Sequence, residues 1–386
     1  MHVLIIYTGE FQTNGPTGGI FQLHQAKVLK NSKIKVGILN PNSISPRYIF
    51  KNYSNIKNKF FDNIPVFRLY EKNFFPSKIK FFNYFLKSKY EKITTELFDQ
   101  YVKKYGKPDL CHVFDIRFGL VAGNIIKLKY KIPFIFTEYC VEIANDTLPL
   151  SKRYIETIVN PLLKNASKVA LPSSKFAKKF KNYFKYKKKI EILPPVLPPD
   201  LNKIKKRSKL KNKDNFRFII VSRLDKNKNI ETPIKAFLKL KKKNIFLTII
   251  GDGPEYSNLK KYFSNKKINF LGNTPRKKML KILAESDCII CSSFNETFGV
   301  GLIEACNFGL PIISSNCEGP SDIVKKINGI IITKNNTQNF YSAMNKIIER
   351  KSRFNKLKII MNIKKRFGKN TYIKKFKKIS NSIINE

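Results

Sequence analysis

The chain has 386 residues, of which 42% are hydrophobic and 13% aromatic, so it carries enough apolar material for two or three domains with packed cores. This composition excludes a mainly disordered chain, and 17 Gly and 19 Pro exclude collagen-like and low-complexity classes. No apolar run reaches the ~18 residues of a membrane-spanning helix, and the start, MHVLIIYTGE, lacks the basic region of a signal peptide. We expect a cytoplasmic protein, and peripheral association with the inner face of the membrane stays open.

Lys and Arg together number 75 and Asp and Glu 27, which gives a formal net charge of +48. Nucleic-acid-binding proteins show this sign of charge, and so do chains whose coding sequence is biased towards Lys, Asn and Ile. Most of the excess lies in residues 151–217 and 351–386, whereas residues 251–350 carry 13 basic and 9 acidic groups. This distribution favours coding bias together with an anionic membrane surface as a partner, and we expect no nucleic-acid partner.

Short apolar runs alternate with segments of helical periodicity along the first half of the chain. The apolar spacing is helical at residues 20–31 and 90–106. The runs expected to form strands are residues 3–7, 35–40, 109–114, 133–138, 168–173 and 190–195.

A basic stretch rich in Asn and Lys, residues 202–215, has no apolar periodicity and indicates a linker. The alternation then begins again, which predicts two Rossmann-like, doubly wound parallel-sheet domains. Sheets of this kind bind ligands at the carboxyl ends of their strands. The strands expected in the second half are residues 216–222, 244–251, 268–272, 288–293 and 311–315.

The cysteines do not form a metal-binding pattern. Cys288 and Cys291 make a CxxC, but they lie in a predicted strand, where positions i and i+3 point to opposite faces of the sheet. Two thiols on opposite faces cannot hold one ion. Since the chain also lacks an Asp-x-Asp motif and has three His, we expect no bound metal.

The segment 292–324, SSFNETFGVGLIEACNFGLPIISSNCEGPSDIV, is the most informative. A predicted strand ends there, and a helix is expected to begin after a short loop. Gly299 and Gly301 allow a ligand to approach the backbone closely. The amides of Phe298, Gly299 and Val300 would then form an anion site that the helix dipole reinforces.

Charged side chains accompany this turn. Glu296 precedes it and Glu304 follows eight residues later on the predicted helix. In a second segment, Arg223 follows the apolar run FIIVS and Lys228 comes five residues later. Two cations at the end of a parallel strand can clamp a diphosphate, whereas each carboxylate alone is typical of a helix cap or a solvated surface.

The combination resembles the retaining glycosyltransferases of family 4, which have the two-domain GT-B fold with a C-terminal helix crossing back to the first domain. ETFGVGLIE is similar to the E-x7-E signature of that family, and the resemblance covers nearly the whole chain. The other matching segments are TGGIFQLHQAKVL, PDLCHVFD, IPFIFTE, SRLDKNK, GDGPEYSNL and FLGNTPRKKML.

The resemblance implies a role for each matching residue. Glu304 would hold the ribose hydroxyls of a nucleotide-sugar donor, and Glu296 would bind hydroxyls of the donor sugar. Arg223 and Lys228 would neutralise the leaving diphosphate without a metal. Backbone contacts are implied for Gly18, Gly19, Phe298, Gly299 and Val300 with the sugar and phosphates, and for Gly272 and Asn273 with the base.

The sequence departs from the family at the group that contacts the sugar. The family often has His after Thr-Glu in the 132–138 strand, but here Tyr139 follows Glu138. His112 is a substitute candidate, although a His beside a strand is more typical of a core or hinge position. We therefore keep Glu138, Tyr139 and His112 as candidate sugar contacts.

Two segments suggest an acceptor at a membrane. Residues 73–90 mix Phe81, Phe82 and other aromatics with lysines, which fits either a helix on a membrane surface or a core helix with snorkelling lysines. Residues 175–189 contain eight lysines, each of which could contribute ~1 kcal/mol near an anionic leaflet.

The resemblance implies a metal-independent hexosyltransferase with no bound cofactor. Its donor would be a nucleotide sugar, preferentially a UDP-sugar, and its acceptor an envelope polysaccharide, lipopolysaccharide or lipid-linked glycan. The alternatives are an epimerase or phosphorylase of the same fold and a non-enzymatic polyanion-binding protein. The expected domains are an acceptor-side domain at 1–200, a nucleotide-sugar-binding domain at 205–365 and the returning helix at 366–386.

Overall fold

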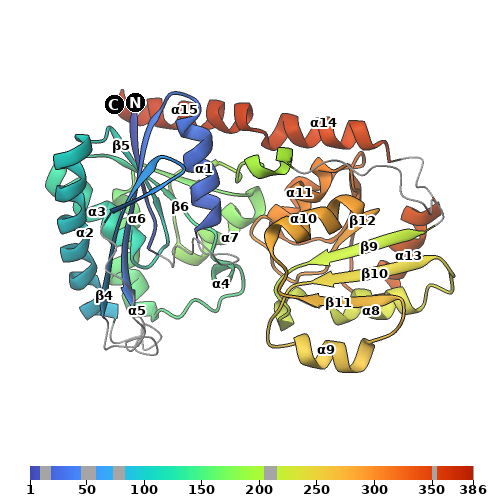
Figure 1. Ribbon diagram of the computed structural model, residues 1–386. Helices are drawn as coiled ribbons and strands as arrows, with labels where there is room; N and C mark the ends of the chain where they lie inside the picture. Colours follow the sequence, from blue (N-terminus) through green and yellow to red (C-terminus); the bar gives the residue numbers. More distant parts are fainter. Residues whose placement is uncertain (9–18, 45–57, 73–82, 204–214, 350–353, 386) are drawn as a thin grey trace. The chain divides into compact units, whose positions relative to one another are not determined.

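The computed structural model describes residues 1–8, 19–44, 58–72, 83–203, 215–349 and 354–385 (Figure 1). Gly18, Phe81, Phe82 and most of the linker predicted at 202–215 lie outside these residues. The chain divides into two compact units. The first unit comprises Met1–Pro172, Phe176–Val196 and Tyr372–Glu386, and the second comprises Ser173–Lys175 and Leu197–Thr371.

The first unit is built on an eight-stranded sheet in the order β3-β4-β2-β1-β5-β6-β7-β8. All neighbouring strands pair in parallel except β3, which pairs antiparallel with β4. The chain leaves the central strand β1 first to one side and later to the other, so the sheet is doubly wound. The strands are β1 (His2–Ile6), β2 (Lys35–Ile44), β3 (Asn58–Phe61), β4 (Ile64–Lys72), β5 (Leu110–Phe114), β6 (Phe134–Thr137), β7 (Lys168–Leu171) and β8 (Ile190–Ile192).

Both faces of this sheet are covered, because successive residues of β1 enter different cores. Leu4 and Ile6 pack with α2 and α3, whereas Val3 and Ile5 pack with α1. The helices of the first unit up to the linker are α1 (Ile20–Lys30), α2 (Asn83–Tyr105), α3 (Gly119–Tyr130), α4 (Val141–Ala144), α5 (Lys152–Tyr154), η3 (Ile155–Val159), α6 (Asn160–Asn165) and α7 (Ser174–Phe184).

The C-terminal helix α15 (Lys369–Ile384) completes the first unit, as the predicted fold class requires. Tyr372, Phe376, Ile379 and Ile383 recur every three or four residues and are buried in the same core as α1. The Tyr372 hydroxyl also donates to Oε1 of Gln25 on α1 at 3.0 Å.

The second unit holds a six-stranded sheet in the order β11-β10-β9-β12-β13-β14, the order of a Rossmann fold. Every neighbouring pair is parallel. The strands are β9 (Phe216–Val221), β10 (Ile245–Ile250), β11 (Ile268–Gly272), β12 (Cys288–Cys291), β13 (Ile312–Ser315) and β14 (Gly329–Ile332). The helices are η4 (Pro199–Lys203), η5 (Lys226–Lys228), α8 (Glu231–Leu238), α9 (Tyr256–Phe263), α10 (Arg276–Glu285), α11 (Val300–Asn307), α12 (Glu318–Ile323), α13 (Thr337–Glu349) and α14 (Lys356–Phe367).

These two sheets confirm the predicted class of two doubly wound α/β domains. Each of the eleven expected strands is present, with ends that differ from the predicted ones by at most four residues. Strands β3, β4 and β14 are not predicted by the sequence, and β2 extends four residues beyond the predicted run. Of the described helices, none is both long and apolar enough to cross a membrane.

Candidate active site

The second sheet has a topological switch point at β9, which pairs with β10 on one side and with β12 on the other. The loops that follow β9 and β12 therefore start side by side at the carboxyl edge, where doubly wound sheets bind ligands. The first loop contains Arg223 and Lys228, and the second contains Glu296. The main candidate residues predicted from the sequence lie in these two loops.

Lys228 and Glu296 form an ion pair at this edge. Nζ of Lys228 lies 2.6 Å from Oε2 of Glu296, and the two side chains are 16% and 23% exposed. Burial acts to lower the pKa of Lys228, but the charge and hydrogen bond of Glu296 outweigh it, so the net shift is upward. Lys228 therefore carries a full positive charge in a partly desolvated position.

Asn227 joins the two loops. Its backbone carbonyl accepts from the amide of Phe294 at 2.8 Å, and its side-chain Nδ2 donates to the carbonyl of Asn295 at 2.9 Å. Ser292 adds a third link, because its hydroxyl donates to the carbonyl of Lys228 at 2.7 Å. These bonds fix the spacing between Lys228 and Glu296, a role for Asn227 that no sequence pattern indicates.

Gly299 begins helix α11 in the left-handed conformation, with φ 96°. A side chain there would be strained, which explains the glycine. The ring of Phe298 is 2% exposed and packs edge-on against Phe367 at 5.5 Å, so the Phe298 side chain serves the core. Its backbone amide, with those of Gly299 and Val300, belongs to the helix N-terminus, where anions are favoured.

Helix α12 supports the same turn. The amide of Glu296 donates to Oε2 of Glu318 at 2.9 Å, and the amide of Gly319 donates to the carbonyl of Glu296 at 2.8 Å. A Cβ added to Gly319 would stand 2.1 Å from Cα of Phe298, so only glycine fits there. Glu318 and Gly319 lie in the segment 292–324, but their contacts with the turn at Glu296 form only in the folded chain.

Glu304 is 4% exposed on α11, so it is not the solvated helix residue that its type alone would suggest. Its Oε1 accepts from Nη2 of Arg276 at 2.7 Å. Arg276 also donates through Nε and Nη2 to both carboxylate oxygens of Asp200, at 2.6 and 3.0 Å. Burial raises the pKa of Glu304, and Arg276 opposes this shift.

The turns after β10 and β11 lie at the same edge of the second sheet. Gly251 and Gly253 have φ values of 137° and 157°, and a Cβ on Gly251 would stand 1.7 Å from the carbonyl oxygen of Ser222. Gly272 accepts through its carbonyl from the Gly251 amide at 3.0 Å, and Asn273 is exposed beside it. Gly272 and Asn273 thus lie among the loops at the carboxyl edge of the second sheet.

Arg223 is placed differently from Lys228. It is 70% exposed, and its Nε lies 3.5 Å from Oδ2 of Asp225. Asp225 also caps η5 by accepting from the Lys228 amide at 3.2 Å. Arg223 is therefore exposed and only weakly paired in this loop, whereas Lys228 is held by its ion pair with Glu296.

In the first unit, Glu138 lies at the carboxyl end of β6 and is 6% exposed. Its carboxylate accepts from the backbone amides of Ile116, Tyr139 and Cys140 at 2.6, 2.7 and 2.8 Å. Burial and the neighbouring Asp115 raise the pKa of Glu138 to about 7, although the three amides oppose the shift.

Two other candidates of the first unit lie near this edge. The Tyr139 hydroxyl accepts from Nε2 of Gln25 at 2.8 Å, and burial raises the pKa of Tyr139. Gly19 is buried at the start of α1, with φ 69°. Gln25, which links Tyr139 to Tyr372 of α15, was not identified from the sequence.

His112 lies within the sheet and is fully buried. Its Nε2 lies 2.9 Å from Oγ1 of Thr137, and its ring packs against Phe114 and Phe376. Burial lowers the pKa of His112 to about 3, so the ring is neutral. This environment is that of a core residue.

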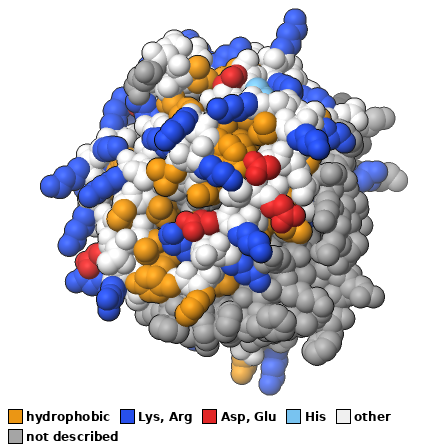
Figure 2. Space-filling model, turned by 90° about the vertical axis from the view of Figure 1, so that its left-hand side faces the viewer, with side chains coloured by type: hydrophobic (Ala, Val, Ile, Leu, Met, Phe, Trp, Pro, Cys, Tyr) orange, Lys and Arg blue, Asp and Glu red, His pale blue; other side chains and the backbone are white. Residues whose placement is uncertain are grey.

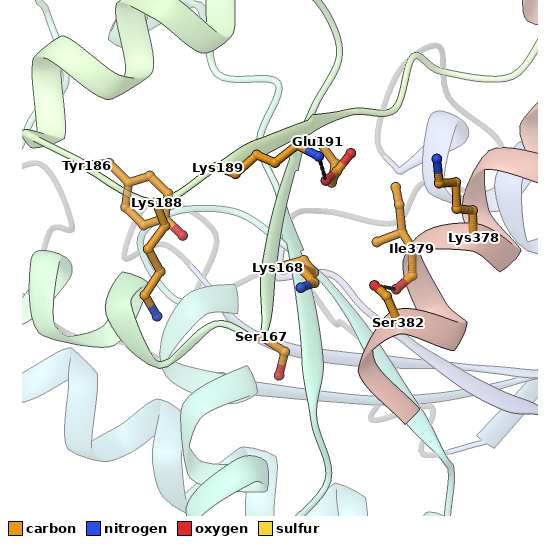
Figure 3. A pocket seen from close by; sticks show the side chains of 9 residues that line it. All are labelled: Ser167, Lys168, Tyr186, Lys188, Lys189, Glu191, Lys378, Ile379 and Ser382. Carbon is orange, nitrogen blue, oxygen red and sulfur yellow. Dashed lines mark hydrogen bonds and ion pairs between the residues drawn. The ribbon is translucent and has the colours of Figure 1, made fainter. Parts of the chain in front are cut away.

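A cavity of about 370 Å³ lies elsewhere in the first unit (Figure 3). Its lining comes from α15 and from the amino ends of β7 and β8, the edge opposite to the one where such sheets bind ligands. It contains none of the predicted site residues. The lining residues are Ser167, Lys168, Tyr186, Lys188, Lys189, Glu191, Lys378, Ile379 and Ser382.

Two family models match consecutive parts of this chain. Residues 62–201 match the model described as Glycosyltransferase Family 4, and residues 202–372 match that of Glycosyl transferases group 1. Together the two models match residues 62–372, so this chain is similar to glycosyltransferases over most of its length. The second model includes both loops with Lys228 and Glu296. The matches agree with the glycosyltransferase resemblance of the sequence, whereas the retaining family 4 assignment stays a prediction.

Among relatives, an uncharacterised glycosyltransferase of Methanocaldococcus jannaschii is 30% identical over 194 residues, which are 47% of this chain and 48% of that protein. The phosphatidylinositol N-acetylglucosaminyltransferase GPI3 subunit of Saccharomyces cerevisiae is 23% identical over 164 residues, 41% of this chain and 35% of its own. The chain thus spans about half or less of the length of these curated relatives.

Solved structures agree over the whole chain. HepE of Anabaena, determined in complex with UDP and glucose, is 17% identical, with a TM-score of 0.72, and the match covers 99% of this chain and 100% of that one. At this identity the match establishes the GT-B fold.

Proposed function

We propose that the protein is a retaining, metal-independent hexosyltransferase of family 4, with a nucleotide sugar as donor. The observation that carries the proposal is the Lys228–Glu296 pair, held beside the Gly299-capped start of α11. A fixed cation and a helix N-terminus can stabilise the charge that grows on a departing diphosphate. The complex of HepE with UDP and glucose supports a UDP-sugar donor.

The roles of the side chains follow from their chemistry. Lys228, assisted by Arg223, would bind the phosphates, and Glu296 would accept from hydroxyls of the donor sugar. Glu304 would accept from the ribose hydroxyls. The bond from the sugar C1 to the phosphate oxygen breaks, the acceptor oxygen bonds C1 from the same face, and the acceptor proton passes to the leaving phosphate. Asn273 and the backbone of Gly272 would contact the base.

In the first unit, Gly19, Glu138 and Tyr139 are the proposed contacts to sugar or phosphate groups. The acceptor is proposed to be an envelope polysaccharide, lipopolysaccharide or lipid-linked glycan. The name of the yeast relative, which specifies phosphatidylinositol, supports a lipid-linked acceptor. A cytoplasmic location with peripheral membrane binding fits this acceptor.

A thermal-shift screen with UDP, GDP, ADP and their sugars tests the donor, because a ligand that binds the folded state raises Tm. NMR of the product formed with the matching sugar donor then reports the anomeric configuration. Stabilisation by UDP-sugars and a retained anomer are expected. An inverted product would contradict the family 4 mechanism, and the absence of any nucleotide effect would contradict the function.

Activity in the presence of EDTA tests metal independence. Since Lys228, Arg223 and the start of α11 supply the positive charge, we expect unchanged turnover after chelation and no gain on adding Mg²⁺. Loss of turnover that Mg²⁺ restores would contradict this part of the proposal.

A further inference from the structure

Arg276 occupies the first position of α10 and contacts two carboxylates at once. Its Nη2 lies 2.7 Å from Oε1 of Glu304, and its Nε and Nη2 hold both oxygens of Asp200. Glu304 and Asp200 are 28 and 76 residues away from Arg276 in sequence. We infer that Arg276 is a positioning residue, which keeps Glu304 ionised and oriented so that the site selects ribose over deoxyribose in the nucleotide. This inference rests on the proposed function.

Arg276 is required because Glu304 is buried. The side chain of Glu304 is 5% exposed, and an ionised carboxylate at such a position is unstable without a cation. Arg276 supplies that cation, and it contacts only one of the two carboxylate oxygens of Glu304, Oε1. Within the described part of the chain, Oε2 of Glu304 receives no hydrogen bond. Glu304 is therefore held by one oxygen and can accept a hydroxyl donor with the other.

Asp200 fixes the guanidinium itself. The two bonds from Arg276 to Asp200 form a bidentate pair, which sets the plane of the guanidinium and aims Nη2 at Glu304. A lysine has no such planar fork and could not satisfy both partners in the same way. The bidentate geometry thus determines the orientation of the Glu304 carboxylate.

The charges of this cluster suit a neutral diol. One guanidinium contacts two carboxylates, so it does not fully neutralise Glu304. The Glu304 carboxylate can accept hydroxyl hydrogens and repels phosphates, whereas Lys228 attracts phosphates. Arg276 also follows the Gly272–Asn273 turn closely in sequence, so groups proposed for base and ribose come from neighbouring positions.

The test compares binding of UDP with binding of 2′,3′-dideoxy-UDP, which lacks both ribose hydroxyls, by calorimetry on the full chain. Hydrogen bonds to a charged group contribute about 1.5–3 kcal/mol, so we expect the native protein to prefer UDP by about 10- to 100-fold. In Arg276→Ala this preference should fall to within a few-fold, while dideoxy-UDP binds as before. If Arg276 only stabilised the fold, its replacement would weaken the binding of UDP and of dideoxy-UDP equally.

A pH series adds a second readout. Without Arg276 the pKa of Glu304 rises further, so in Arg276→Ala the preference for UDP should return as the pH rises and Glu304 ionises. In the native protein, where Arg276 opposes this rise in pKa, the preference for UDP should depend less on pH than in Arg276→Ala. Lys277→Ala, which removes the adjacent exposed cation, should keep the native preference at every pH and is the matched control.

Arg276→Lys provides a second variant should the alanine variant not fold. It keeps the cation but lacks the fork, so the preference for UDP should drop without the new pH dependence. If both Arg276 variants kept the preference of the native protein for UDP over dideoxy-UDP, the inference about Arg276 would be wrong and the proposed function would stand. A native protein that binds UDP and dideoxy-UDP equally would overturn the role of Glu304 as well, and one that binds no nucleoside diphosphate would overturn the proposed function.

Discussion

At the scale of single residues, Lys228 and Arg223 share a loop and a charge but differ in how they are held. Lys228 is fixed by Glu296 at 2.6 Å, whereas Arg223 is largely exposed. A fixed cation stabilises a growing charge better, because it need not be reoriented during the reaction. The two cations should therefore contribute unequally to catalysis.

Replacing Lys228 with Ala should lower kcat by about 100-fold, since loss of one preorganised contact to developing charge costs about 3 kcal/mol. Arg223→Ala should lower kcat less. Steady-state kinetics with a soluble acceptor measures both, and Lys226→Ala, an exposed cation of the same loop, is the control that should match the native enzyme. An increase in KM with native kcat in Lys228→Ala would show a role in ground-state binding only.

Glu138 gives a prediction about pH and stability. Its pKa is raised from 4.5 to about 7 in the folded protein, so between these values the folded state keeps a proton that the unfolded chain releases. Stability should therefore fall as the pH rises from 5 to 8, by on the order of 3 kcal/mol from this group. Urea denaturation followed by circular dichroism measures the fall.

The matched variant for this prediction is Glu138→Gln, which cannot ionise. It should be less stable overall, because the amide nitrogen cannot accept from every backbone amide that Glu138 serves. Its stability should lose the part of the pH dependence that comes from position 138. An identical pH profile in the native protein and the variant would show that Glu138 keeps its ordinary pKa.

At the scale of helices and strands, the turn that contains Glu296 depends on glycine at 319. In Gly319→Ala the new Cβ would meet the backbone of Phe298, and such overpacking costs about 1–3 kcal/mol. The turn must then move, so nucleotide affinity should fall more than stability does. Thermal unfolding and UDP titration of the same sample separate the two effects.

Gly301→Ala is the control for the stability measurement alone, because it lies on α11 and its Cβ would meet only the Val221 carbonyl oxygen, at 4.0 Å. Alanine is favoured over glycine inside a helix by about 1 kcal/mol, so this variant should be slightly more stable. Unchanged UDP binding in Gly319→Ala would mean that the turn adapts without cost to the site.

The sequence predicted the class of fold and most strands because a buried parallel strand needs a continuous apolar run, which is local information. It missed β14, a run of only four residues, and β4, in which Arg68 and Glu71 interrupt the apolar run. From the sequence, candidate site residues could be identified only where glycines and charges are close together. Contacts such as Arg276 with Asp200 could not be identified, because only the folded chain brings these residues together.

The chain as a whole carries a formal net charge of +48. On the face shown in Figure 2, Lys and Arg side chains are spread over the described surface among few acidic ones. Helix α7 buries its apolar side, including Phe176 and Phe180, in the core. Any membrane contact of residues 175–189 would then be electrostatic, through lysines, without insertion of this helix.

The contribution of these lysines to membrane binding can be measured with vesicles. Lys178, Lys187 and Lys189 are exposed, and replacing all three with Gln should weaken binding to vesicles of phosphatidylglycerol by about 100-fold, at ~1 kcal/mol for each lysine. Vesicle sedimentation at rising salt measures the binding, which should fall as screening increases. Turnover on a soluble acceptor should stay native, because these residues lie outside the proposed site.

The control replaces Lys241, Lys243 and Lys266, exposed lysines of the second unit, with Gln and removes the same total charge. Equal loss of vesicle binding in both triple variants would mean that net charge alone drives adsorption, as coding bias predicts. A selective loss in the 175–189 variant would assign the membrane contact to that segment. If the 175–189 variant instead lost turnover on the soluble acceptor, these lysines would belong to the active site, because removing charges from a distant surface does not alter kcat.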